Sequence, residues 1–248
     1  MKYAGSQFQR ALLLLLMMFG VLLLPGCIVP ATYTTQEHRV FSLSPDDLQQ
    51  YGIAFITPSS ITGREQDRQS LALTFAEVLR KKYPEIKVVS LPETLGLLNR
   101  AGLLEEYKQM YVDYADTGIF RRDILNKISE ETGARYLAQL NLAQFNQGAA
   151  GRFGFLGWRL LETKRATLRV FLQIWDGQKG TIAWEGYEEM NYAKDTYSEQ
   201  GVSFNDIATA IAEHMVDAIP YKKRAKKTES QQATKKAPKV KPILIETD

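Results

Sequence analysis

The residue types that most often carry chemistry are scarce in this chain of 248 residues. It has one cysteine, Cys27, and two histidines, His38 and His214, too few for a thiol-rich or imidazole-rich metal site. The spacings typical of zinc proteases, serine hydrolases, redox dithiols and phosphate-binding loops are all absent. We therefore expect no catalytic residue, no cofactor, no metal site and no enzymatic activity. An enzyme whose site these motifs do not describe is left open as an alternative.

The start of the chain has the pattern of an export signal. Lys2 and Arg10 precede an uncharged apolar run over residues 11–24, which Pro25 ends. A positive segment followed by an apolar segment of this length is typical of a secretory signal peptide. The run is shorter than the roughly 20 apolar residues of a membrane-spanning helix.

The chemistry that the sequence does indicate is lipidation of Cys27. The residues Leu24-Pro25-Gly26-Cys27 resemble the bacterial lipobox. The resemblance implies cleavage before Cys27, a thioether to diacylglycerol and N-acylation, with palmitate as the expected acyl group. Several acyl chains, at about 0.8 kcal/mol per buried CH₂, make a firm anchor. The alternative is an uncleaved signal anchor in which Cys27 is a bystander thiol.

The residue after Cys27 bears on which membrane holds the anchor. In lipoproteins of envelopes with two membranes, an aspartate here is associated with retention in the inner membrane, and this chain has Ile28. The resemblance therefore implies the outer membrane, with the protein facing the periplasm.

The net charge of +3 hides an uneven distribution. Basic residues gather near the two ends, and residues 27–220 are mildly acidic, so no nucleic-acid partner is expected. The lysine-rich end, residues 221–248, is too polar to form a core and reads as a disordered tail. It is either a solvated tail or a contact to an anionic polymer or lipid surface. The candidate contact residues are Lys222, Lys223, Arg224, Lys226 and Lys227.

A second candidate contact surface is the segment 147–158, in which glycines alternate with aromatic residues. Phe153, Phe155 and Trp158 lie here with little charge nearby. Such a segment predicts a flexible loop that touches a partner, a neighbouring subunit or lipid headgroups. The alternative is a loop that folds its aromatic side chains back onto the body.

The periodicity of the middle of the chain predicts an α/β fold. Apolar runs alternate with helical stripes up to Gly133, and later segments alternate apolar and polar residues as paired strands do. We expect a mixed sheet of about five strands covered by helices, with a C-terminal antiparallel hairpin and a final helix that Ser203 caps. The expected divisions are a signal peptide (1–26), a lipidated cysteine and tether (27–49), the α/β domain (50–220) and the tail (221–248).

Two smaller predictions concern side chains inside that domain. Tyr107, Tyr111 and Tyr114 are spaced to share one helical face, which indicates a packing stripe rather than a ligand-stacking surface. His214 lies in the final helix without a second ligand in view, so we expect a partly buried or surface histidine rather than a metal ligand.

Short motifs within residues 50–190 resemble the curli-secretion-channel-like lipoproteins. They are the run Leu172 to Gly177 with its return Gly180 to Trp184, the strand entry Thr132 to Leu137, and an opening strand that ends at Pro58. Arg135 stands where that group has an aspartate. The family includes oligomeric secretion pores, activators of cell-wall synthases, and lipoproteins of unknown role. Residues 147–162 are too short for the two spanning strands of the pore members, so the chain departs from that pattern.

These observations predict a non-enzymatic, lipid-anchored envelope lipoprotein that acts as a docking or assembly module. Expected partners are the membrane through the anchor, an envelope protein or a second copy of the chain, and an anionic polymer through the tail. The first alternative is a subunit of an oligomeric export or assembly complex in the envelope. The second is an unrecognised enzyme.

Overall fold

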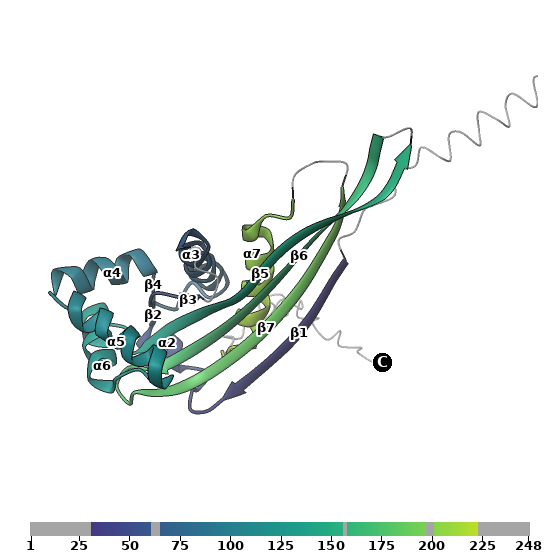
Figure 1. The fold of residues 1–248 in the computed structure, drawn as a ribbon. Coiled ribbons are helices and arrows are strands. Elements are labelled where there is room, and N and C mark those ends of the chain that lie inside the picture. Colours follow the sequence, from purple (N-terminus) through teal and green to yellow (C-terminus); the bar gives the residue numbers. More distant parts are fainter. Residues whose placement is uncertain (1–30, 61–64, 156–157, 197–200, 223–248) are drawn as a thin grey trace, which may run out of the picture.

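A computed structural model describes residues 31–60, 65–155, 158–196 and 201–222. In this part of the chain one mixed seven-stranded sheet runs in the order β1-β7-β6-β5-β2-β4, with β3 beside β5 (Figure 1). The short strands β2 (Ile53–Phe55), β3 (Ser59–Ser60) and β4 (Val88–Val89) pair in parallel. The long strands pair antiparallel.

The helical half of the chain lies between β3 and β5. It comprises α3 (Glu65–Lys82), α4 (Leu91–Arg100), α5 (Leu104–Thr117) and α6 (Arg122–Thr132), preceded by the short α2 (Asp47–Tyr51). The Ser90 amide donates to the Glu93 carboxylate at 2.6 Å, which closes a capping box at the start of α4. Gly133 ends α6 with a φ of 59°, a conformation that favours glycine.

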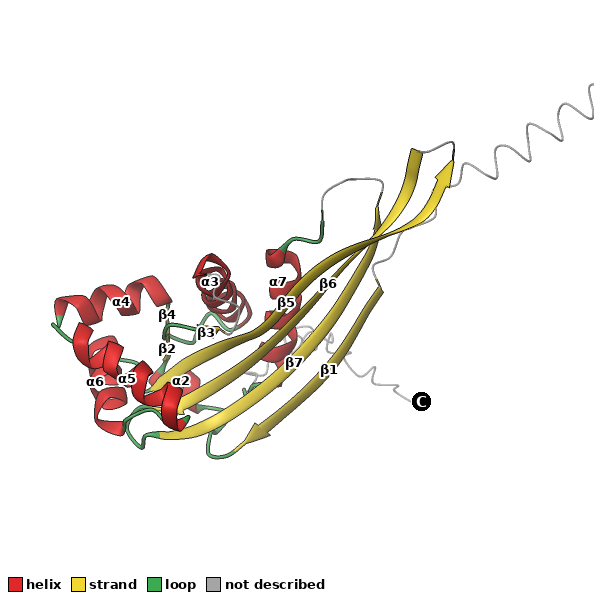
Figure 2. Cartoon of the chain, in the orientation of Figure 1, coloured by secondary structure: helices red, strands yellow, loops and turns green. Residues whose placement is uncertain are grey.

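The antiparallel half is built from long strands and the last helix. They are β5 (Tyr136–Phe155), β6 (Trp158–Asp176) and β7 (Thr181–Thr196), with β1 (Ala31–Val40) on the outside of β7 and α7 (Phe204–Ala218) following. Ser203 caps α7 by accepting the Asp206 amide at 3.1 Å. Helices α4, α5 and α6 gather at one end of the sheet, and the β5–β6 hairpin projects from the other end (Figure 2).

Two hydrophobic cores hold the sheet, one on each face. On the inner face, α3 and α7 pack on alternate residues of β5, β6 and β7, such as Leu140, Leu172 and Trp184. On the outer face, α4, α5 and α6 pack around Leu137 and Trp175, at one end of the sheet only. The remainder of the outer face, on β1, β7, β6 and β5, is the surface that we call the outer sheet face.

The predicted fold class is confirmed. A mixed sheet with helices, the antiparallel pairing of the late strands and the final helix are all present. The sheet has seven strands instead of about five because the exposed strand β1 and the two-residue strand β3 carry weak sequence signals.

Two expectations about irregular segments were wrong. Part of the predicted tether, residues 31–40, forms strand β1, whose side chains are all exposed and therefore show no periodic burial. The segment 147–158, expected to be a loop, continues the ladder of β5 and β6 as far as the pair Phe155 and Trp158. Glycine and alanine have low strand propensity, and the backbone pairing with β6 overrides it.

Candidate functional site

The predicted contact residues fall at different ends of the molecule. Cys27, Lys223, Arg224, Lys226 and Lys227 lie outside the described residues. Lys222 is described, and its amide donates to the Pro45 carbonyl at 3.2 Å while its ammonium group lies 3.6 Å from Asp46. The start of the basic tail is therefore fixed beside α2, at the opposite end of the sheet from the projecting hairpin.

The backbone of the aromatic segment forms the end of the β5–β6 hairpin. Strand β7 stops at Thr196, which pairs with Glu162, so beyond that level the described part of the sheet consists of β5 and β6 alone. Phe153, Phe155 and Trp158 belong to this two-stranded end. The structure thus brings these residues together on one hairpin, and it separates them from the start of the tail.

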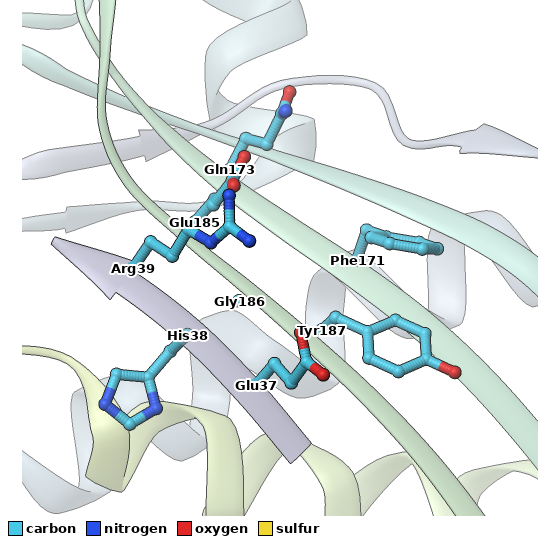
Figure 3. Close-up of a pocket in the computed structure, with 8 residues that line it drawn as sticks. All are labelled: Glu37, His38, Arg39, Phe171, Gln173, Glu185, Gly186 and Tyr187. Carbon is cyan, nitrogen blue, oxygen red and sulfur yellow. The ribbon is translucent and has the colours of Figure 1, made fainter. Parts of the chain in front are cut away.

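A groove of about 340 Å³ on the outer sheet face was not found from the sequence. Its lining comes from three neighbouring strands (Figure 3): Glu37, His38 and Arg39 of β1, Phe171 and Gln173 of β6, and Glu185, Gly186 and Tyr187 of β7. The register places Glu37 beside Tyr187, and Tyr187 beside Phe171. The groove lies just beyond the part of the face that α5 and α6 cover.

Two aromatic rings form one wall of the groove, and the Tyr187 ring is held by hydrogen bonds. The centroids of the Phe171 and Tyr187 rings are 4.7 Å apart, and Phe171 remains 42% exposed. The Tyr187 hydroxyl donates to Glu189 at 3.0 Å, and Arg169 donates to the same carboxylate at 2.6 and 2.9 Å. These contacts lower the pKa of Glu189, while burial and the Glu189 contact raise the pKa of Tyr187.

The three tyrosines of α5 form a packing stripe, as predicted. This stripe lies next to the groove. Tyr107 is buried, and its hydroxyl donates to Thr57 Oγ1 at 2.9 Å and accepts the Thr57 amide at 2.8 Å. The Tyr111 hydroxyl donates to the Thr57 carbonyl at 2.6 Å. Burial raises the pKa of both hydroxyls, so they stay neutral. The stripe ends at Tyr114, whose hydroxyl lies 3.4 Å from Gln173 at the edge of the groove.

The groove has the features of a binding surface. Aromatic carbon, carboxylates, an amide and a guanidinium group line it, and it is open on one side. No group of three or more histidine, cysteine, aspartate or glutamate residues suited to a metal occurs within the described residues. No helix in that part of the chain is long and apolar enough to cross a membrane.

The sequence contained one signal for the groove. Phe171 alternates with Leu172 and Val170, and so lies on the polar side of β6 among threonine, arginine and glutamine. A large aromatic residue on the polar face of a central strand indicates a surface that is either covered by another part of the chain or used to bind a partner. The partners on β1 are 130 residues or more away in sequence, and only the β1–β7 pairing brings them alongside.

A second polar site lies on the inner sheet face, between β7 and α7. Glu188 is fully buried, and its Oε1 lies 2.9 Å from His214 Nδ1, while no hydrogen-bond partner for its Oε2 occurs within the described residues. His214 is half exposed, which agrees with the partly buried or surface position expected for it. Burial raises the pKa of Glu188, and the contact with His214 opposes this rise.

Replacement of His214 by alanine is expected to destabilise the protein by about 1–3 kcal/mol, because the buried Glu188 then loses its partner. The raised pKa of Glu188 means that the folded state binds the proton of this carboxyl more tightly than the unfolded state does. The destabilisation caused by His214→Ala should therefore shrink as pH falls toward the usual pKa range of glutamate. Urea unfolding at several pH values measures it. A matched His214→Ala, Glu188→Gln variant should lack this pH dependence, and an equal dependence in both would contradict the assignment.

Comparison with known proteins gives distant structural likeness alone. No family model matches the chain, and no curated protein matches its sequence. The PelC dodecamer of Paraburkholderia phytofirmans is 13% identical with a TM-score of 0.42, covering 77% of this chain and 99% of that chain. Lipoprotein GNA1162 of Neisseria meningitidis is 14% identical with a TM-score of 0.33, covering 67% and 98%. The LpoB C-terminal domain of Salmonella enterica is 12% identical with a TM-score of 0.30, covering 59% and 94%.

Likeness at this level assigns no function. These structures come from bacteria, and one of them is described as a lipoprotein. None of the three is described as a curli-secretion channel, and the resemblance to that family stays a prediction.

Proposed function

We propose that the protein is a non-enzymatic lipoprotein, anchored through Cys27 and acting as a docking or assembly module in the bacterial cell envelope. The observation that carries this proposal is the register of the sheet. Ala31 pairs with Ala193, which pairs with Arg165, which pairs with Gly148. The chain therefore enters the sheet at the end from which the β5–β6 hairpin projects (Figure 1).

The lengths involved support a position of the hairpin end close to the proposed anchor at Cys27. The four residues from Cys27 to Ala31 span at most about 14 Å. The hairpin continues from Gly148 to Phe155, about 23 Å at roughly 3.3 Å per residue. With acyl chains on Cys27, the hairpin end with Phe153, Phe155 and Trp158 reaches the lipid surface, and the opposite end of the body faces away from it. This arrangement leaves α4, α5, α6 and the start of the tail for partners, including the anionic polymer proposed for the tail.

The test of the anchor is the Cys27→Ala variant. Expressed with its signal, the wild-type protein should stay in the membrane fraction after high-salt and carbonate washes, and should incorporate a labelled palmitate analogue. The variant should lose the label and pass into the washed supernatant, because aromatic contacts alone are weaker than acyl chains. A variant that stays wholly in the washed membranes would refute the anchor. We further propose the outer membrane, which fractionation of the two membranes tests.

The free edge of β1 supports a second candidate function, that of a subunit in an oligomeric export or assembly complex. β1 is an edge strand of ten exposed residues, and β7 is its sole neighbour among the described strands. An exposed edge of this length is a template for pairing with another chain. Light scattering of the detergent-extracted protein separates the two candidates, since a discrete oligomer favours the complex and a monomer favours docking.

A further inference from the structure

The outer sheet face is an open surface on otherwise well-covered strands. Its residues alternate with the buried core positions of β5, β6 and β7. The packing of those core positions therefore fixes the spacing of the side chains on the outer sheet face. Figure 3 shows Glu37, Phe171 and Tyr187 of three different strands side by side on this surface. Because the backbone is held in paired strands, the side chains form a preorganised array rather than a mobile loop.

Planar polar side chains dominate this array. Amide groups are contributed by Asn141, Gln144, Asn146, Gln173 and Asn191, all of them at least partly exposed. Carboxylates and guanidinium groups are contributed by Glu37, Glu185, Glu189, Arg39 and Arg169. Each such group presents two hydrogen-bonding atoms at a fixed spacing. This geometry suits neighbouring hydroxyl groups, which both donate and accept.

The aromatic pair supplies the apolar part of the array. Phe171 is exposed at the centre of the face, and Tyr187 is fixed against Glu189. A sugar ring has one apolar face of C–H groups and a rim of hydroxyls, so it can lie on an aromatic ring while its hydroxyls reach the surrounding polar groups. The groove of about 340 Å³ is in the range of small-molecule sites, at their lower end.

The same composition argues against other ligands. A protein interface needs a central apolar patch depleted in charge, whereas the apolar part here is the single pair Phe171 and Tyr187, with charged and amide groups around it. A polyanion needs clustered lysine and arginine, whereas the outward positions of the described strand segments 33–39, 141–146, 167–173 and 185–191 carry no lysine. Arg169 is moreover neutralised by Glu189. The surface is close to neutral and rich in hydrogen-bonding groups.

We propose that the outer sheet face binds a weakly charged glycan chain, with one sugar ring on Phe171 and Tyr187 and the hydroxyls of that ring and its neighbours bonded to Glu37, Glu185 and Gln173. The site does not depend on lipidation of Cys27, so its test is separate from that of the anchor.

The test is binding of hexasaccharides of glucose and of N-acetylglucosamine to the full chain, extracted in a detergent without a sugar headgroup. Calorimetry should give a Kd on the order of 1 mM or tighter for at least one of them. Phe171→Ala should weaken it at least about tenfold, the scale of a lost aromatic contact. Tyr187→Phe, which keeps the ring, should change it by less than about threefold. Leu104→Ala, at another exposed apolar site, on α5, is the control.

Each other outcome overturns the proposal. These are no binding of either sugar, an equal loss in Phe171→Ala and Leu104→Ala, or binding of a hexagalacturonate or of a peptide with the sequence 222–241 in place of the neutral sugars. The midpoint of thermal unfolding of Phe171→Ala should match that of the wild type, since the side chain is exposed. A lower midpoint would mean that the variant loses binding because its fold is destabilised, and not because a contact to the sugar is missing.

Discussion

Replacing Arg135 with methionine is expected to lower the free energy of unfolding by about 3–5 kcal/mol, because it removes the closer counter-ion of a buried carboxylate and leaves it only the exposed Lys179 ammonium, 3.8 Å away. Asp176 is 1% exposed and accepts two hydrogen bonds from Arg135, at 2.6 and 3.1 Å. It also accepts the amides of Gln178 and Lys179, which form the turn between β6 and β7. The methionine side chain keeps most of the packing volume of the arginine stem against Tyr51 and Tyr136.

The pH dependence of this effect follows from the pKa of Asp176. Burial raises the pKa, but the hydrogen bonds from Arg135 and the turn amides outweigh it and hold the pKa below the usual value. A depressed pKa contributes stability above about pH 4 that is lost as pH falls through the folded-state value. Because the unfolded states are alike, the difference in unfolding free energy between wild type and Arg135→Met, measured by urea unfolding, should be constant near neutral pH and shrink as pH falls through the Asp176 pKa of the variant and then through that of the wild type.

The control for this prediction is the double variant Arg135→Met, Asp176→Asn. An uncharged amide can still accept the two turn hydrogen bonds, so the double variant should recover a large part of the lost stability. If Arg135→Met alone costs less than about 1 kcal/mol, the pair does not hold the turn as described.

The second large effect is expected at Gly186, where an alanine should cost about 1–3 kcal/mol through overpacking. A β-carbon on Gly186 would lie 2.3 Å from Cη2 of the Trp184 ring. The ring is fully buried between the sheet and α7, and it has no space into which to move. Thermal or urea unfolding of the purified variant measures the loss.

Gly148 offers a matched control on β5. A β-carbon there meets nothing within 4 Å, so Gly148→Ala should be neutral or slightly stabilising. The cost of Gly186→Ala should also fall in a Trp184→Phe background, because the smaller ring vacates the contested space. Equal effects at the two glycines would show that loss of strand flexibility, and not contact with Trp184, sets the cost.

The sequence predicted the parts of the fold that bury a regular apolar stripe. The capping signal at Ser203 placed the start of the last helix, because such a signal acts within one turn of chain. Strand β1 was not predicted because its stability comes from backbone pairing with β7. Its side chains are all exposed, so their sequence shows no pattern that indicates this pairing. The groove was not predicted for the same reason, since its β1 wall exists through that pairing alone.

The ion pair of Arg135 and Asp176 shows a different limit. Both residues were singled out within separate motifs, one at the entry to β5 and one at the end of β6. Neither motif contains the other partner, and the contact depends on the antiparallel register that places Tyr136 opposite Asp176. Local patterns specify elements well, whereas contacts between distant segments require the assembled sheet.

The pairing of β1 with β7 has a consequence for biosynthesis. Val40 of β1 pairs with Trp184 of β7, so the whole intervening domain must be synthesised before these two strands can pair. Strand β1 is thus made before its neighbour β7 and pairs with it only after β7 has been synthesised. Pairing between segments so far apart in the chain is slow, and until it occurs the edge of β7 can pair with other chains. Newly made chains should therefore depend on holdase chaperones for longer than their size alone suggests.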